Sequence, residues 1–336
     1  MLNAAIVGLG RWGKSLVNSV HGKSDEIRFV AGATGTRAKA EGFCRERNIA
    51  LVDRFDDLLR NDAVEAVVLA TPNSQHAQQI MQAAAAGKHV FVEKPMTLAR
   101  KTADEAVAAT QKAGVVLAVG FPRRFAPSIA ETRRRLQDGR LGTLVSMVGQ
   151  QTSGTAPFMA HDNWRADEEE SPAGSMTGVG VHLMDHMIEF GGPVREVYCR
   201  AVDRGGYGHD NTTTVMLNFE SGLTATISCS TATAPNFNFS VYGTKGLAET
   251  TRTNLQMFRF TPMPDRPPEG PVTAPESEII DFAGFDMLNA ELTAFARSVT
   301  SRIPFPVHID EVLHGMSVFD AVVESATSGS IVRVAR

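Results

Sequence analysis

Residues 4–13 read AAIVGLGRWG, an apolar run that leads directly into the glycine pattern G-x-G-x-x-G. This order is typical of a β-strand, a tight turn and the start of a helix. Gly8 allows the tight turn, Gly10 lets the main chain approach a pyrophosphate, and Gly13 lets the helix pack closely on the strand. The N–H groups at the helix start also favour phosphate. An ordinary glycine-rich turn is the alternative interpretation. The predicted dinucleotide-binding loop comprises Gly8, Leu9, Gly10, Arg11, Trp12 and Gly13.

Short apolar runs alternate with helix-like segments over the first 120 residues. Continuous apolar strands separated by helices indicate a parallel sheet covered on both faces. Right-handed crossovers make this arrangement a doubly wound Rossmann fold. The expected strands are residues 4–7, 27–33, 66–70, 89–92 and 115–119, and the expected helices are residues 13–20, 37–47, 76–86 and 99–113.

Beyond residue 120 the hydrophobic pattern changes to period two, clearest in residues 223–230, where apolar residues alternate with Thr and Ser. We expect two domains: a Rossmann domain over residues 1–120 and a substrate-binding and oligomerisation domain over residues 121–336. The second domain is predicted to be α+β, with a large, mostly antiparallel open sheet and helices on one face. Its last helix could pack on either domain. Residues 261–275 carry six prolines and predict an exposed loop. The other expected strands are residues 144–151, 195–202, 211–219, 237–242 and 247–250, and the expected helices are residues 178–190, 285–300 and 310–325.

The composition is that of an ordinary globular protein of 336 residues, with 43% hydrophobic residues and a net charge of −4. It has no basic run that would favour nucleic acid, and its three cysteines show no metal or redox spacing. No apolar stretch reaches the roughly 18 residues of a membrane span. Residues 1–10 lack the basic region and cleavage site of a signal peptide. A cytoplasmic location is therefore expected, with neither nucleic acid nor a membrane as partner.

The end of the second expected strand predicts which dinucleotide is bound. An acidic residue about 20 positions after the glycine loop would bind the ribose 2′-hydroxyl. That position holds Thr34, and no carboxylate lies between Phe29 and Ala40. Hydroxyls and an arginine can instead bind a 2′-phosphate. We therefore predict that Thr34, Thr36 and Arg37 bind the cofactor, with NADP preferred and NAD possible. The alternative is that Arg37 only starts the next helix in solvent.

Further motifs follow the expected strands in order, and with the glycine loop they resemble the Gfo/Idh/MocA family (glucose–fructose oxidoreductase, inositol dehydrogenase and rhizopine-catabolism proteins). The resemblance covers essentially the whole chain, and its most specific element is E-K-P after the strand at residues 89–92. It implies an NAD(P)-dependent oxidoreductase that interconverts a secondary alcohol and a ketone on a sugar, cyclitol or related polyhydroxy compound. The motifs are TPN at 71–73 with His76, GKHVFVEKP at 87–95, GFPRRF at 120–125, WR at 164–165 and HLMD at 182–185.

The lysine of E-K-P is the predicted proton-transfer residue. Hydride transfer at a carbinol carbon requires proton transfer at its oxygen, which a lysine at a strand end can polarise and protonate. By resemblance, Lys94 is catalytic and Pro95 follows a cis bond, while Glu93 would steady the cofactor or the lysine. A solvated surface lysine is the alternative. The other predicted cofactor contacts, with capping or turn roles as the alternative, are Thr71, Pro72, Asn73 and His76.

The chain departs from the family at the predicted substrate histidine, His182. The family often carries Asp four residues earlier, where this chain has Gly178. Glycine cannot bind a substrate hydroxyl or orient the histidine, and it leaves extra room. Lys94 and His182 could suffice, another carboxylate could take over, or the protein could bind cofactor without this chemistry. The room also favours a bulkier or less hydroxylated substrate. The alternatives are therefore a dehydrogenase of cyclic dihydrodiols or aromatic-ring-derived hemiacetals, and a non-catalytic NADP-binding sensor.

The remaining substrate predictions come from the same resemblance, which places Trp164 and Arg165 near the substrate. Arg124, with Arg123, could bind an anionic substrate or form an ion pair. Asp185 stands in the wrong place for a zinc motif, so no metal is predicted. A half-apolar outer sheet face would suit a homodimer or homotetramer.

Overall fold

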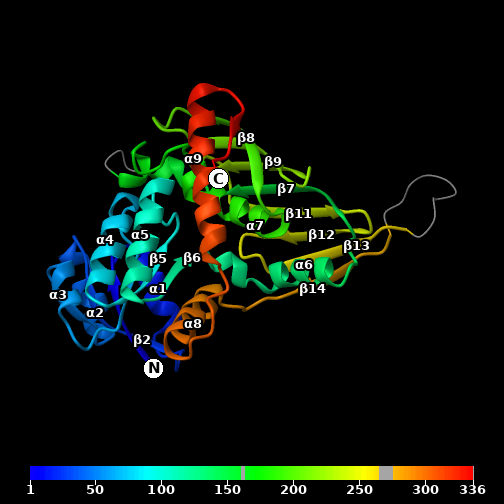
Figure 1. The fold of residues 1–336 in the computed structure, drawn as a ribbon. Coiled ribbons are helices and arrows are strands. Elements are labelled where there is room, and N and C mark those ends of the chain that lie inside the picture. Colours follow the sequence, from blue (N-terminus) through cyan, green and yellow to red (C-terminus); the bar gives the residue numbers. More distant parts are fainter. Residues whose placement is uncertain (160–162, 265–274, 336) are drawn as a thin grey trace. The chain divides into compact units, whose positions relative to one another are not determined.

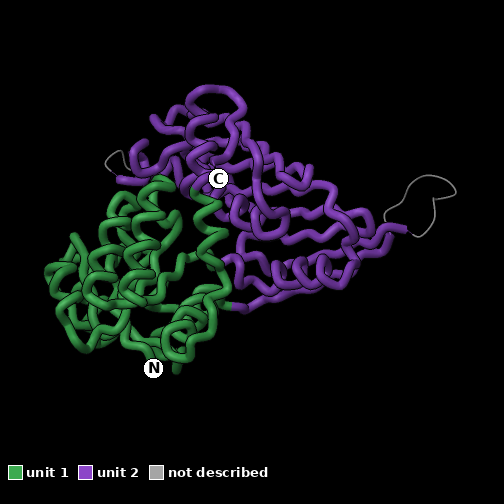
Figure 2. Tube along the Cα trace, in the orientation of Figure 1, with its two compact units in different colours: residues 1–122, 286–316 green, residues 123–285, 317–336 purple. Residues whose placement is uncertain are grey.

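The structure is a computed structural model that describes residues 1–159, 163–264 and 275–335 (Figure 1). The chain forms two compact units (Figure 2). The first unit comprises residues 1–122 and 286–316, and the second comprises residues 123–285 and 317–336. The first unit therefore holds the predicted Rossmann segment together with a later part of the chain. The predicted boundary at residue 120 stays a prediction.

The first unit, whose residues are all described, is built on a parallel sheet with strand order β3-β2-β1-β4-β5-β6. Every residue of β4 is buried, as expected for a strand with helices on both faces. The order reverses between β1 and β4, which is the topological switch point where ligands of such sheets bind. The Rossmann prediction is confirmed. The strands are β1 Leu2–Val7, β2 Ile27–Ala33, β3 Ala50–Val52, β4 Ala66–Leu69, β5 His89–Glu93 and β6 Leu117–Gly120.

The helices of the first unit cover both faces of this sheet. Because β2 and β4 lie on opposite sides of β1, right-handed crossovers place α1 and α4 on opposite faces. The helix α8 packs against α1, β1 and β2, and α4 packs along α5. The helices are α1 Arg11–Val20, α2 Glu41–Glu46, α3 Phe55–Leu59, α4 His76–Ala85, α5 Arg100–Ala113 and α8 Met287–Thr300, and short 3₁₀ turns span Arg37–Lys39 and Asn73–Gln75. A further 3₁₀ turn, Pro122–Phe125, begins at the last residue of the segment 1–122 and continues into the second unit.

The predicted helix at 37–47 is wrong in detail, because the chain forms a 3₁₀ turn and then the short α2. The strand β3 was not among the expected runs, since three residues are too few for a recognisable pattern. It matters because it brings another strand end beside β2.

The second unit is built on a large mixed sheet with strand order β14-β13-β12-β11-β7-β10-β9-β8-β15. Among its described residues, only the β7–β10 pair is parallel. The predicted mostly antiparallel sheet is confirmed. The strands are β7 Leu144–Thr152, β8 Val194–Val202, β9 Thr212–Phe219, β10 Thr224–Ser230, β11 Asn236–Gly243, β12 Gly246–Thr251, β13 Met257–Pro262, β14 Glu278–Asp281 and β15 Val332–Arg333.

Helices of the second unit cover one face of this sheet. The helix α7 packs on β7 and β10, and α6 packs on β12 and β13. A Cβ at Gly149 of β7 would lie 2.8 Å from Leu183 and 3.0 Å from Met187, so glycine there lets α7 approach. The helices are α6 Pro127–Gln137, α7 Val181–Gly191 and α9 Ile309–Ser328, which spans both units; a π-helix spans Met176–Gly180 and 3₁₀ turns span Ala156–Phe158 and Trp164–Ala166.

The helix α6 was not predicted, because three of its four buried positions are polar. One of them, Arg135, is fully buried. Its Nη2 donates to Glu278 Oε1 at 2.5 Å, and its guanidinium faces Phe258 and Phe260. A hydrophobic pattern cannot reveal a helix whose inward face is held by charge and cation–π contacts.

The predicted proline-rich loop is also corrected at its start. Thr261 and Pro262 end the strand β13. Residues 265–274 of that loop lie outside the described residues. Among the described residues, no helix is long and apolar enough to cross a membrane, and the predicted cytoplasmic location stays a prediction.

Candidate functional site

The glycine loop follows β1 and begins α1, and its main chain fits a pyrophosphate. Gly8 has φ of +93°, and a Cβ there would clash with the main-chain oxygen of Ala70. A Cβ at Gly13 would clash with the main-chain oxygen of Gly8. At Gly10, the N-cap residue of α1, a Cβ would meet no atom within 4 Å. The loop is therefore packed tightly on the protein side and open at Gly10, where a phosphate could approach the helix N–H groups.

The other predicted residues of the first unit lie at the same edge of the sheet. Because the strands are parallel, their carboxyl ends deliver residues 34–37, 71–73 and 93–94 beside the glycine loop. Lys94 directly follows β5 and is half-buried, and Glu93 is buried. The Lys94–Pro95 peptide bond is cis. One edge therefore collects the predicted cofactor-binding and proton-transfer residues of this unit.

The buried ring of His76 joins two of these loops. Its Nδ1 lies 3.0 Å from the carbonyl oxygen of Pro95, and its Nε2 lies 3.2 Å from that of Thr71. Both partners accept hydrogen bonds, so a neutral imidazole donates to one of them while the other nitrogen lies against the second carbonyl. The ring is thus packed between the loop after β4 and the loop after β5. This geometry supports a positioning role for His76, and its predicted contact with the cofactor stays a prediction.

The guanidinium of Arg37 lies between two carboxylates. Its Nη1 donates to Asp53 Oδ1 at 2.5 Å, and its Nε donates to Glu41 Oε1 at 3.1 Å. Asp53 directly follows β3, where Val52 pairs with Ala33 of β2. Sequence reasoning missed Asp53 because it searched for an acidic residue only on the chain that leaves β2.

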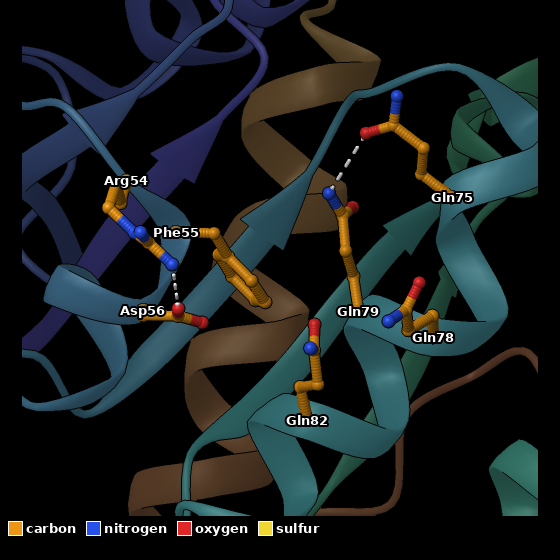
Figure 3. A pocket seen from close by; sticks show the side chains of 7 residues that line it. All are labelled: Arg54, Phe55, Asp56, Gln75, Gln78, Gln79 and Gln82. Carbon is orange, nitrogen blue, oxygen red and sulfur yellow. Dashed lines mark hydrogen bonds and ion pairs between the residues drawn. The ribbon is translucent and has the colours of Figure 1, made fainter.

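A polar hollow of about 380 Å³ lies between α3 and α4 (Figure 3). Gln79 connects it to the site, because its Oε1 accepts a 2.7 Å hydrogen bond from Thr71 Oγ1. Neither the glycine loop nor Lys94 lines it, so this hollow is separate from the predicted proton-transfer residue and the predicted pyrophosphate-binding loop. Its lining comprises Arg54, Phe55, Asp56, Gln75, Gln78, Gln79 and Gln82.

In the second unit, His182 is the buried second residue of α7, just after the π-helix. A Cβ at Gly180 would clash with Met176 Sδ and lie 2.9 Å from Cys229 Sγ, so glycine lets these two buried side chains pack against the turn. A Cβ at Gly178 would meet no atom within 4 Å. Packing among the described residues therefore does not explain why this chain has glycine at 178.

A buried ion-pair network anchors α7. Arg124 Nε and Nη2 donate to the two carboxylate oxygens of Asp185, each at 2.7 Å. One turn later, Glu189 accepts from Arg133 and lies 3.6 Å from Arg124 Nε and from His186 Nδ1. The predicted substrate contact of Arg124 stays a prediction, and the geometry supports its positioning α7. Within the described residues, no group of three His, Cys, Asp or Glu side chains could hold a metal ion.

Trp164 and Arg165 form a local unit in a 3₁₀ turn. The Arg165 guanidinium stacks on the Trp164 ring at 4.0 Å, and the main-chain N–H of Arg165 donates to Asn163 Oδ1 at 3.1 Å. Arg123 donates to Gln151 Oε1 at 2.7 Å. The structure places these residues in the second unit, and their contact with a substrate stays a prediction. His161 of the same segment lies outside the described residues.

A doubly wound unit with a glycine loop, followed by a unit on a large mixed sheet, defines a two-domain dinucleotide-binding class of protein. Two family models match this chain. One, described as "Oxidoreductase family, NAD-binding Rossmann fold", matches residues 2–121, and the other, "GFO/IDH/MocA C-terminal domain", matches residues 129–249. The chain belongs to the Gfo/Idh/MocA family of oxidoreductases.

Proteins with different names are similar to this chain. The D-xylose 1-dehydrogenase (NADP(+)) 2 of Haloferax volcanii is 29% identical over 326 residues, which is 96% of each chain. The scyllo-inositol 2-dehydrogenase (NAD(+)) of Bacillus subtilis is 34% identical over 168 residues, 48% of each chain. A solved levoglucosan dehydrogenase, in complex with NADH and levoglucosan, has a TM-score of 0.88 at 19% identity and covers 100% of both chains. That structural likeness concerns the fold alone.

The network around α7 predicts a loss of stability in acid. Burial acts to raise the pKa of Glu189, but the interaction with His186 and the charges of Arg124 and Arg133 outweigh it and lower this pKa from 4.5 to about 2. A depressed carboxyl pKa stabilises the folded state above pH 4.5, and this contribution is lost as the pH falls from 4.5 towards 2. It amounts to at most about 3 kcal/mol.

Glu189→Gln should therefore lower the free energy of unfolding at pH 7 and flatten its decline between pH 4.5 and 2, as measured by urea denaturation. Glu169→Gln, at an exposed carboxylate of the same unit, is the control. If the free energy of unfolding of Glu189→Gln fell with pH as steeply as that of the native protein, the contribution assigned to Glu189 would be contradicted.

Proposed function

We propose that this protein is an NAD(P)-dependent oxidoreductase that interconverts a secondary alcohol and a ketone on a sugar, cyclitol or related polyhydroxy compound. The observation that carries the proposal is the position of Lys94. It follows β5 at the edge where the glycine loop follows β1, beside the switch in strand order. Ligands of doubly wound sheets bind at that switch point.

The bound nicotinamide would supply or accept the hydride. Lys94 would donate a hydrogen bond to the carbonyl or hydroxyl oxygen of the substrate and exchange its proton. Partial burial favours this role, because desolvation makes an ammonium group a better proton donor. His182 is proposed to assist the proton transfer. Trp164 and Arg165 are proposed to contact the substrate.

The cofactor preference follows from the end of β2. We propose that NADP is preferred over NAD, because Thr34, Thr36 and Arg37 can bind a 2′-phosphate and no carboxylate stands on that segment. Relatives named for NADP and for NAD both occur, so the family alone leaves the preference open. The contacts of Arg37 with Asp53 and Glu41 would have to yield or rearrange for a 2′-phosphate to bind.

A second candidate activity is favoured by the space at Gly178. A cyclic dihydrodiol or an aromatic-ring-derived hemiacetal offers fewer hydroxyls than a free sugar and needs fewer polar partners. The missing side chain at 178 would leave room for a ring. A screen of cofactor reduction over polyols, sugar acids and cyclic diols would distinguish the two substrate classes.

Lys94→Ala should abolish turnover of whichever substrate the screen finds, with kcat reduced at least about 100-fold. The dissociation constant of the cofactor should change little, because the alanine keeps the glycine loop intact. Lys101→Ala, at an exposed lysine of α5, is the matched control and should retain activity. Normal turnover by Lys94→Ala would remove this lysine from the mechanism. If no compound in the screen oxidises or reduces the cofactor, the interpretation of the protein as a non-catalytic NADP-binding sensor replaces the proposed enzyme.

Gly178→Asp should fold normally, because a Cβ at this position meets no atom within 4 Å. Its carboxylate could bind a substrate hydroxyl, so kcat/KM for myo-inositol should rise relative to that for cyclic diols. Gly178→Asn is the uncharged control, and Gly180→Ala should lower Tm because of its clash with Met176. High activity of the native protein on myo-inositol would contradict the proposed role of Gly178.

We propose that the protein forms a homodimer or homotetramer through the open face of its second sheet. Tyr198, Met216 and Val148 are exposed on this face. The strand register places them in one cross-strand row, with Thr226 between Met216 and Val148. An apolar row on an uncovered sheet face suits a second copy of the chain.

Val148→Asp should shift the protein towards the monomer in light scattering, because a carboxylate would be buried at the interface. Phe158→Asp changes an exposed aromatic residue outside the row and serves as the control. An unchanged mass for Val148→Asp would exclude this face as the contact.

A further inference from the structure

The residue after β2 is Thr34, which has no carboxylate, but the residue after the neighbouring β3 is Asp53. In the parallel β2–β3 pair, Ala33 lies opposite Val52. Thr34 and Asp53 are the next residues along the two chains, so Asp53 emerges beside the predicted cofactor segment. Its carboxylate reaches Arg37, the arginine predicted to bind a 2′-phosphate, at 2.5 Å.

We propose that Asp53 is a specificity-determining residue that restrains Arg37 and thereby lowers the affinity for NADP relative to NAD. This inference rests on the proposed function, because it concerns the same cofactor site. Asp53 acts through Arg37 and is a positioning residue, not a catalytic one.

The charge of the cluster supports this role. Arg37 carries one positive charge, and Glu41 and Asp53 carry one negative charge each, so the three groups together are already net negative. A 2′-phosphate adds further negative charge and must share the guanidinium with both carboxylates. The 2′-hydroxyl of NAD is uncharged and meets no such repulsion.

The two carboxylates differ in position. Glu41 lies four residues after Arg37 at the start of α2, so this pairing is local in the sequence. Asp53 comes from the neighbouring strand, and β-sheet register holds its main chain at the carboxyl edge. The Leu51 carbonyl oxygen also lies 3.4 Å from Arg37 Nη1, on the same side as Asp53. The guanidinium is therefore drawn towards β3.

Exposure limits the size of the effect. The side chain of Asp53 is 79% exposed and that of Arg37 is 47% exposed, so water and salt screen their interaction. Because exposed ion pairs contribute little free energy, we expect the loss of Asp53 to change the ratio of NADPH and NADH affinities only several-fold.

The test is Asp53→Asn in the full chain, with NADPH and NADH titrated separately and followed by nicotinamide fluorescence. The dissociation constant of NADPH should fall about three- to fivefold, and that of NADH should change less than about twofold. Asp57→Asn removes the same charge from a different pair, that with Arg60, and should leave the ratio unchanged. The gain in NADPH affinity should shrink as KCl is raised, because salt screens the repulsion.

Arg37→Ala and the double variant Arg37→Ala/Asp53→Asn complete the cycle. If Asp53 acts through Arg37, Asp53→Asn should alter the NADPH affinity much less once Arg37 is absent. If Asp53→Asn binds both cofactors with the native ratio of dissociation constants, the role of Asp53 is overturned and the proposed function stands. An equal effect with and without Arg37 would overturn the positioning mechanism. Failure of the native chain to bind either dinucleotide would overturn both.

Discussion

The carboxyl edge of the parallel sheet, where the predicted cofactor-binding residues lie, depends on the close approach of Gly8 to the end of β4. A side chain at Gly8 would clash with the Ala70 carbonyl, and one at Gly13 would clash with Gly8 itself. These contacts hold the turn after β1 against the neighbouring strand end and leave its outer side open at Gly10. The residues that follow β2, β4 and β5 owe their common location to the same parallel sheet. His76 then ties the loop after β4 to the loop that carries Lys94.

In the second unit, buried ion pairs hold α7, the helix that carries the candidate residue His182. Arg124 binds both oxygens of Asp185 in a buried setting, and Glu189 lies between two arginines one turn later. Buried ion pairs lose much of their Coulomb energy to desolvation. We therefore interpret this network chiefly as a means of orienting α7, on which His182 lies, with the pH-dependent stability from Glu189 as a second consequence.

Much of the fold follows from local patterns. The Rossmann strands are continuous apolar runs, and β10 alternates between buried and exposed residues with period two. The elements that were missed have specific reasons. The helix α6 turns the polar residues Ser128, Thr132 and Arg135 inward, and β3 is three residues long. Hydrophobic periodicity carries no signal in either case.

The candidate site likewise contains residues that local sequence reveals and contacts that only the folded chain brings together. The glycine spacing, E-K-P and the glycine at 178 are readable in the chain itself, because each depends on residue type within a few positions. The partners of Arg37, the contacts of His76 with two loops and the pairing of Arg124 with Asp185 join residues that lie 4 to 61 positions apart. Parallel pairing of β2 with β3 brings Asp53 to Arg37, and helix packing brings Asp185 to Arg124. Local sequence determined the chemistry that is available, whereas folding determined which charges meet, because strand register and helix packing act between distant segments.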